Sequence, residues 1–130
     1  MANPNLLAAT TASGTTTYLT PSGTSAVVLV PNAASSGQVF KINQIVVANT
    51  TGTAASATVS IYTNGAQSQG SAPSSGTAYP IVSAVSVPAN ASLIAVDKTT
   101  AVYLMEGTSI TITSGTASSL TFSISYEVIS

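Results

Sequence analysis

The sequence predicts an all-β protein, folded as an antiparallel β-sandwich or jelly roll of about eight to nine short strands. Apolar and polar residues alternate along several segments, as they do in strands that bury one face. Clusters of Gly, Pro, Asn, Asp and Ser separate these segments at intervals of about ten residues. No segment repeats its apolar residues with the helical period over a useful length. These patterns together indicate short strands joined by polar turns.

The clearest alternation lies in residues 119–129, near the C-terminus. The apolar residues of this run share one face of an extended chain, and they are Leu120, Phe122, Ile124, Tyr126 and Val128. Residues 109–114 show the same pattern, with Ile110 and Ile112 on one face. Because a Gly-Thr-Ala-Ser turn separates the two runs, we expect them to pair as a hairpin.

A second long strand is expected over residues 38–49. Its strong apolar residues form two pairs on opposite faces, Phe40 with Ile42 and Ile45 with Val47. One extra residue at positions 43–44 would bring both pairs to the same face of the strand. The sequence therefore predicts a β-bulge at this point.

Shorter strands are expected over residues 15–20, 26–30, 57–63, 79–87, 92–96 and 101–105. Pro80 indicates an edge strand or a kink, since proline cannot donate to a ladder. The Asn-Gly pair at 64–65 opens a loop over 64–77 whose small residues offer little to bury, as in loops that carry variation or contacts. Residues 1–14 lack periodicity and are expected to form an irregular N-terminal arm, which leaves residues 15–130 as a single β-sandwich domain.

The alternating apolar residues are expected to form the core, and they are Phe40, Ile42, Ile45, Val47, Val59, Ile61, Leu104, Ile110, Ile112, Leu120, Phe122, Ile124 and Tyr126. Residues 26–30 are apolar without alternation, which fits a strand that is covered on both faces. A strand of this kind suits a contact between subunits. The candidate interface residues are therefore Ala26, Val27, Val28, Leu29 and Val30.

Charge is scarce in this chain: charged residues make up 4% of the 130 residues, and the formal net charge is −1. The chain's two basic residues cannot neutralise a run of phosphates or form a polybasic patch on a membrane. We therefore expect neither nucleic acid nor a membrane as a partner, and no apolar run approaches the ~20 residues of a membrane span. The absence of Cys excludes disulfides and thiolate metal sites.

Few residues are able to carry catalytic chemistry, and the chain has no His. Without His, serine and cysteine nucleophiles lose their usual base, and imidazole metal ligands are missing. Lys41 and Lys98 do not follow a Ser-x-x-Lys spacing. Asp97 and Glu106 flank one expected strand, as a pair for glycoside hydrolysis or for Ca²⁺ would, but their positions favour turn residues. The sequence thus predicts a protein that is not an enzyme and uses no cofactor or metal.

Two further patterns carry little weight. Glycosylation sequons begin at Asn49 and Asn90, but such matches are expected by chance in a chain so rich in Ser and Thr. Four tyrosines would be available for a sugar-binding surface, although tyrosines more often lie at the edge of a core with a hydrated hydroxyl. These tyrosines are Tyr62, Tyr79, Tyr103 and Tyr126.

Four segments, IVVANTTG (45–52), VPANASL (87–93), VYLMEGTSI (102–110) and SYEVIS (125–130), resemble small virion structural proteins of tailed bacteriophages, marine phages and cyanophages among them. The resemblance covers the chain from about Lys41 to the C-terminus. It implies a β-sandwich subunit that decorates the capsid or forms part of the tail apparatus. Of these two, we expect a subunit that decorates or cements the capsid, with the major capsid protein as a partner. The alternative is a tail- or head-surface adhesin that binds a host glycan or receptor through residues 64–77 and nearby tyrosines. The first ten residues lack the features of a secretory signal, as expected for a virion protein made in the host cytoplasm.

The scarcity of charge also bears on assembly. Monomeric proteins guard exposed sheet edges with lysine, inward-pointing charges or proline. This chain has two lysines, and only Pro80 lies inside an expected strand. Edges left unguarded are typically covered by neighbouring subunits. We therefore expect a homo-oligomer, with a trimer as the closed form by analogy with other sandwich-type virion proteins.

Overall fold

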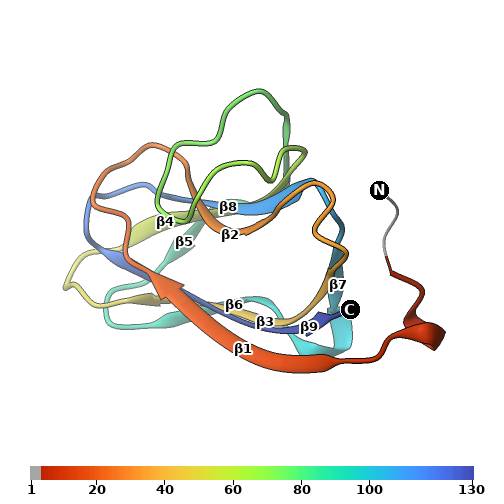
Figure 1. Cartoon of the computed structure of the whole chain (residues 1–130). Helices are drawn as coiled ribbons and strands as arrows, with labels where there is room; N and C mark the ends of the chain where they lie inside the picture. Colours follow the sequence, from red (N-terminus) through yellow and green to blue (C-terminus); the bar gives the residue numbers. More distant parts are fainter. Residues whose placement is uncertain (1–3) are drawn as a thin grey trace.

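Strands with one apolar face bury those faces together, and here they form two antiparallel sheets packed face to face (Figure 1). The computed structural model describes residues 4–130. The first sheet runs in the order β1 (Ala12–Leu19), β9 (Leu120–Ile129), β3 (Val39–Asn49) and β6 (Ser92–Val96), with β7 (Val102–Leu104) also paired to β3. The second sheet runs in the order β2 (Val27–Asn32), β8 (Thr108–Ser114), β4 (Ala55–Tyr62) and β5 (Ala78–Val87). Two short 3-10 helices complete the elements, η1 (Leu6–Ala8) before β1 and η2 (Lys98–Thr100) between β6 and β7.

The strand order is that of a jelly roll once β6 and β7 are taken together. Both pair with β3, β6 along residues 45–48 and β7 along residues 40–42, so they are two parts of one interrupted strand. Each sheet then has four strands, and only β4 and β5 are consecutive in the chain and also neighbours in a sheet. The predicted all-β sandwich is confirmed.

The predicted hairpin between the last two strands is wrong, because β8 lies in the second sheet and β9 in the first. The turn between them is tied to other loops instead: the Gly115 N–H donates to the Ser56 carbonyl at 2.8 Å, and the Ser118 N–H donates to the Pro21 carbonyl at 2.9 Å. Alternation along a strand reports which face is apolar. It does not distinguish two strands that pair from two strands that face each other across a core.

The core lies between the sheets. The expected core residues that are buried are Phe40, Ile42, Ile45, Val47, Val59, Leu104, Ile110, Ile112, Leu120, Phe122 and Ile124. Ile61 and Tyr126 are partly buried and pack against this cluster. The cluster also contains residues that the alternation did not single out, namely Leu29, Val30, Ala55, Ala57, Val87 and Val96.

The predicted β-bulge in the second long strand is confirmed. The register between β3 and β9 shifts between Ile42 and Gln44. Ile42 and Ile45 are both fully buried as a result, although they have opposite parity in the sequence.

The N-terminal arm ends earlier than predicted, because β1 begins at Ala12 and pairs there with Ile129. Thr11 and Ser130 extend this ladder, since the N–H of each donates to the carbonyl of the other at 3.0 Å. Residues 12–14 show no apolar alternation of their own, and it is the long partner strand β9 that makes them a strand. The sandwich domain thus starts at residue 12 instead of 15. Of the predicted arm, residues 1–3 lie outside the described residues.

Strand β2 is covered on both faces, as its sequence requires, but the cover comes from its own chain. Leu29 and Val30 lie in the core. Val28 pairs with Thr111, whose two neighbours along β8 point into the core, so Val28 points to the outer face of the second sheet. Its exposed fraction is nevertheless 0%.

The loop of residues 64–77 lies over the outer face of the second sheet, beside β2 (Figure 1). The Val28 N–H donates to the Ser71 carbonyl at 2.9 Å, and the Gly70 N–H donates to the Val28 carbonyl at 2.8 Å. The prediction that Val28, Leu29 and Val30 contact another subunit is therefore wrong, and Ala26 and Val27 are half-buried. The sequence shows that a strand needs cover on both faces, but not which segment supplies it.

This loop is also packed against the sheet and folded on itself. Asn64 Nδ2 donates to the Ser74 carbonyl at 2.9 Å, and the Gly76 N–H donates to the Tyr62 hydroxyl at 3.0 Å. Gly65 is buried where a Cβ atom would fall closer than 3.0 Å to main-chain oxygens of β2 and β8. Residues 64–77 thus form a compact, well-packed loop that covers the outer side of β2, as Ω-loops do.

Candidate interaction surface

The outer face of the first sheet presents side chains from its strands to solvent. Across its middle runs a row of cross-strand neighbours contributed by β1, β9, β3 and β6, namely Tyr18, Ser123, Val46 and Ile94. Tyr18 is 70% exposed and Ile94 is 58% exposed. Because directly opposite residues have Cβ atoms about 5 Å apart, the row forms a continuous band across the sheet.

Hydroxyl groups fill the rows on either side of this band. Thr16 Oγ1 and Ser125 Oγ lie 3.0 Å apart, and Thr20 Oγ1 and Thr121 Oγ1 lie 2.8 Å apart. A hydroxyl both donates and accepts, so each pair satisfies itself without any charge. The middle of the face is therefore polar and uncharged, with large apolar side chains set into it.

One end of the face gathers two of the chain's five charged residues, counted as two basic plus three acidic. Lys41 Nζ and Glu127 Oε2 lie 4.0 Å apart on β3 and β9. Asn43 Nδ2 donates to the same carboxylate oxygen at 3.0 Å, and Tyr103 flanks Lys41 on β7. Solvent screens the ion pair because both charged side chains are partly exposed, so it contributes little to stability.

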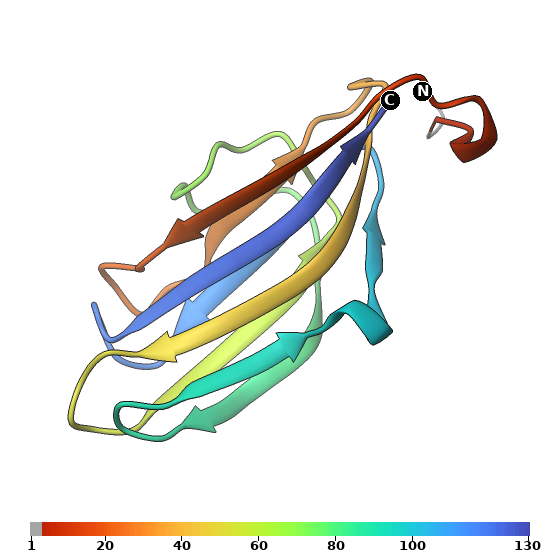
Figure 2. The ribbon, with the colours of Figure 1, turned by 90° about the horizontal axis from the view of Figure 1, so that it is seen from below.

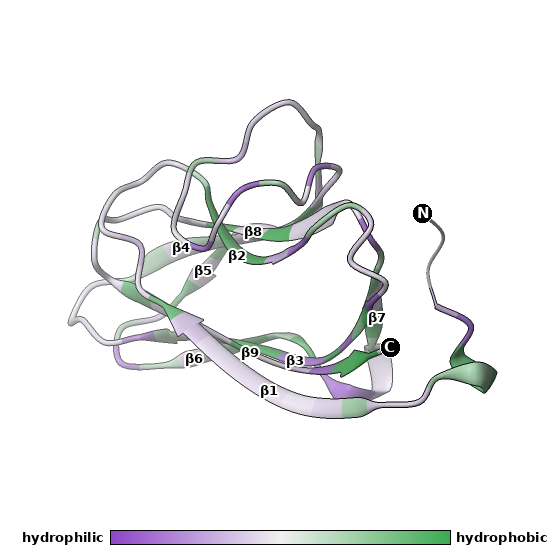
Figure 3. Ribbon diagram, viewed as in Figure 1, coloured by the Kyte–Doolittle hydropathy of each residue, from purple (hydrophilic) through white to green (hydrophobic). Residues whose placement is uncertain are grey.

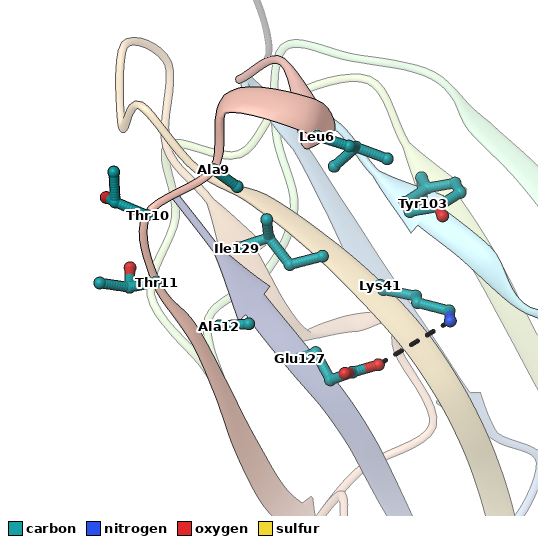
Figure 4. Close-up of a pocket in the computed structure, with 9 residues that line it drawn as sticks. All are labelled: Leu6, Ala9, Thr10, Thr11, Ala12, Lys41, Tyr103, Glu127 and Ile129. Atoms are coloured by element: carbon teal, nitrogen blue, oxygen red, sulfur yellow. Dashed lines mark ion pairs between the residues drawn. The ribbon is translucent and has the colours of Figure 1, made fainter.

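A cavity of about 410 Å³ opens between this end of the face and the N-terminal arm (Figure 4). Leu6 and Ile129 form apolar walls, Tyr103 adds an aromatic ring, and Lys41 and Glu127 supply polar groups. The volume is that of a small-molecule site. A carboxylate and an ammonium group are able to hydrogen-bond the hydroxyls of a polyhydroxylated ligand, and an aromatic ring beside them offers a face for its apolar side.

The two carboxylates that flank β7 serve separate loops. Asp97 caps η2, where it accepts hydrogen bonds from the Thr99 and Thr100 N–H groups. The hydroxyl of Thr99, followed by its N–H, holds the pKa of Asp97 below its ordinary value. Glu106 Oε1 instead accepts from the Gly37 N–H at 3.1 Å. Asp97 thus orders the turn in which it lies, as the turn interpretation of the sequence predicts, whereas Glu106 holds the loop between β2 and β3.

The four tyrosines considered for sugar binding do not share a surface. Tyr62 is buried beneath the 64–77 loop, and Tyr79 is exposed on β5 in the second sheet. Tyr126 packs against Phe40 with ring centroids 5.1 Å apart, and burial raises the pKa of its hydroxyl. Only Tyr103 lines the cavity. The most exposed tyrosine, Tyr18, was not singled out, because a short Thr-rich strand does not reveal which of its sides faces solvent.

The first sequon is not a glycosylation site in the folded chain. Asn49 is 3% exposed, and its Nδ2 donates to the Thr53 carbonyl at 2.8 Å and to the Val87 carbonyl at 3.0 Å. Its Oδ1 accepts from the N–H and the hydroxyl of Thr51. The Asn49 side chain is thus a buried clamp between β3 and the turns around it. Asn90 lies exposed in a turn with φ of 56°.

Comparisons with protein-family models, with curated proteins and with solved structures find no match to this chain. Within residues 4–130, no helix is long and apolar enough to cross a bilayer. The same part of the chain brings together no group of three or more His, Cys, Asp or Glu side chains that would hold a metal ion. The function of the chain is therefore inferred from its own residues.

Proposed function

We propose that this chain is a non-enzymatic structural subunit of a bacteriophage virion that decorates or cements the capsid. The observation that carries the proposal is the composition of the outer face of the first sheet. There the exposed side chains of Tyr18 and Ile94 lie in a surface of uncharged residues that is rich in Ser and Thr hydroxyls. Protein interfaces are depleted of charge at their centre and enriched in tyrosine, as this face is. The jelly-roll order is also that of many capsid domains, although a fold alone does not assign a function.

In this role the face docks on the major capsid protein, and further copies of the chain are its other partners. Covering hydroxyls costs less than covering charges, because a hydroxyl regains its hydrogen bonds from almost any polar neighbour. Each contact is modest, and its repetition over a particle makes the coat stable. The working location of the chain is then the virion.

Purified particles of the phage that encodes the chain test this proposal. The chain should be found in many copies per particle, whereas a few copies would indicate a tail component. Ile94→Lys puts a charge into this band of the face and should sharply reduce the number of bound copies. Ser86→Lys, on exposed β5 in the second sheet, is the matched control and should bind normally. Absence from the particle, or equal binding of both variants, would refute the proposal.

The cavity beside Tyr103 favours a second function, that of a surface adhesin that binds a host glycan. Its aromatic ring, ammonium group and carboxylate are the groups that recognise a sugar. A glycan array with the isolated chain tests this function. Tyr103→Ala should abolish any specific binding. Tyr79→Ala, which changes another exposed tyrosine on the other sheet, should not. An array with no specific signal leaves the decoration role as the better proposal.

A further inference from the structure

Each sheet of the sandwich ends in two edge strands, β1 and the interrupted β6/β7 in the first sheet, and β2 and β5 in the second. Three of these edges are guarded. Gly70 and Ser71 bond to the free side of β2. β5 contains Pro80 and an irregular register in which Ala84 has φ of 49°. β6/β7 is interrupted by η2, which contains Lys98 and is capped by Asp97. Bulges, prolines and charges are the devices that keep an edge from pairing with another chain.

Strand β1 has none of these guards. It is eight residues long, it contains no proline and no charged residue, and its register with β9 runs without a shift. Figure 2 shows it as the outermost strand of the first sheet, and Figure 3 shows it pale along most of its length, which marks near-neutral hydropathy. A long, regular and uncharged edge is the kind that accepts another strand.

The free hydrogen-bonding groups of β1 belong to alternate residues. Thr11 and Ser130 exchange both of their bonds, so every second residue from Thr11 onward bonds to β9 in the same way. The N–H and C=O groups of the residues in between point away from β9, to the open edge. These residues are Ala12, Gly14, Thr16 and Tyr18.

A side chain from elsewhere in the fold supports this assignment. Gln69 Nε2 donates to the Tyr18 carbonyl at 3.4 Å, from the side of the strand opposite β9. Within the described residues, no group bonds to the outward N–H and C=O groups of Ala12, Gly14 and Thr16. The N-terminal arm leaves them open, because it turns over the face toward Tyr103 (Figure 4).

We propose that two copies of this chain associate through β1, their strands pairing antiparallel about a two-fold axis at Gly14. In this register Gly14 lies opposite Gly14, and Ala12 lies opposite Thr16 on each side of the axis. All three residues have outward groups, so each of these pairs exchanges two N–H···O bonds. The first sheets of the two copies then form one continuous sheet. This pairing rests on the edge itself and holds whatever surface the chain decorates.

The properties of the edge favour a second copy of the chain as the occupant. A Cβ atom built at Gly14 meets nothing within 4 Å, and Ala12 and Thr16 are small, so another strand can approach closely. β1 carries no charge, and a net charge of −1 gives almost no repulsion between copies. A two-fold contact needs only one surface on each copy, whereas a closed trimer needs two different ones. With the other edges guarded, the two-fold pair is favoured over the trimer expected from the sequence.

The pair is expected to be weak in solution. A contact made through one strand of each copy is smaller than the standard interface of roughly 1,200–2,000 Å², as in transient complexes, so we expect it to form only at high concentration. On a particle the same contact is repeated between molecules that are already held in place. Its effective concentration is then high enough to keep it formed.

Sedimentation equilibrium of the whole chain, from low micromolar to millimolar concentration, tests the proposal. The expected result is a monomer–dimer equilibrium. Gly14→Pro removes an outward N–H and keeps the bonds to β9, so it should weaken dimerisation about tenfold or more. Gly14→Ala keeps the N–H and should dimerise like the unmodified chain. Thermal unfolding of both variants shows whether the sandwich is intact.

Amide hydrogen exchange of the unmodified chain gives a readout that needs no variant. The N–H groups of Ala12, Gly14 and Thr16 should be protected at high concentration and exchange freely at low concentration. Those of Ser13 and Thr15, which bond to β9, should be protected at both. Rapid exchange of the outward groups at high concentration would overturn the proposal.

Three other results would also overturn the pairing: a monomer at all concentrations, a dimer that Gly14→Pro leaves unchanged, or a closed trimer. The chain could instead bind an extended segment of another protein along β1 without forming dimers. That result would assign the edge to the other protein and would also overturn the proposed pairing. Absence of the chain from phage particles refutes the virion role alone, and it leaves the β1 pairing standing.

Discussion

At the scale of single residues, Phe122 is the side chain on which the core depends most clearly. It is fully buried on β9, between β1 and β3, and it is the largest of the fully buried side chains. Phe122→Ala should lower the free energy of unfolding by ~3–5 kcal/mol, because it leaves a cavity and also loses buried area. Thr121→Ala, one residue away on the outer face, should cost less than ~1 kcal/mol. Urea denaturation measures both, and equal losses would contradict the assigned faces of β9.

Asp97 provides a test at low pH. Hydrogen bonds from the Thr99 hydroxyl and N–H lower its pKa from the ordinary value of 3.8. Because the folded pKa lies below the unfolded one, the cap stabilises η2 above pH 3.8, and this contribution is lost as pH falls through the folded pKa. Thr99→Val removes the largest cause of the shift and should raise the pKa of Asp97 toward 3.8. NMR titration of the carboxyl group measures this change, with Thr116→Val as a distant control that should leave it unmoved.

At the scale of elements, the cover over β2 depends on a close approach at Gly65. A Cβ atom there would collide with the main-chain oxygens of Asn32 and Thr108, which cannot move without disturbing two strands. Gly65→Ala should therefore lift the 64–77 loop and lower the melting temperature, and the Val28 N–H should lose protection against hydrogen exchange. Gly52→Ala is the matched control, since a Cβ atom there meets nothing within 4 Å. Unchanged protection of Val28 in Gly65→Ala would show that the loop does not depend on this approach.

The elements also show how far local sequence determines structure. The bulge in β3 was predictable, because the apolar residues change parity inside this long strand. One extra residue returns both sets to the core at little cost in free energy. Pro80 indicated an edge strand or a kink, because proline cannot donate to a second neighbour, and the strand order shows that β5 is an edge strand. The cover of β2 by residues 64–77 was not predictable, because it depends on main-chain bonds to Gly70 and Ser71, and any residue types can make those.

At the scale of the whole molecule, the same limit applies to the interaction surface. Alternation identifies the outward residues of β9 and β3. The strand order is also needed to show that they lie on one face with Tyr18 and Ile94, which it brings into the same row. The five charges were visible in the sequence, whereas the meeting of Lys41 and Glu127 beside the arm was not. The expectation of unguarded edges was too broad. Three of the four edges are guarded by features of the chain itself, which leaves β1 as the edge open to another copy.

The N-terminal arm gives a test of assembly that spans the whole molecule. Residues 4–9 make no backbone hydrogen bond to the sandwich, the first being from the Thr10 N–H to the Ser130 carbonyl at 2.8 Å, and Leu7 is 98% exposed. The arm is therefore held only weakly on the sandwich, because ordering costs about 1–2 kcal/mol per residue and little burial offsets it. A protease that cleaves after large apolar residues should therefore cut free subunits at Leu6 or Leu7.

The same protease should spare Tyr18 in free subunits, because β9 holds that residue in a ladder even though its side chain is exposed. Tyr18 is thus an internal control for the folded state. In assembled particles the arm should resist cleavage as well, since a neighbouring subunit that covers Leu7 supplies the burial that the free subunit lacks. Mass spectrometry of the fragments measures both states. An arm that is protected in the free subunit, or cut equally in particles and in free subunits, would show that assembly does not order it.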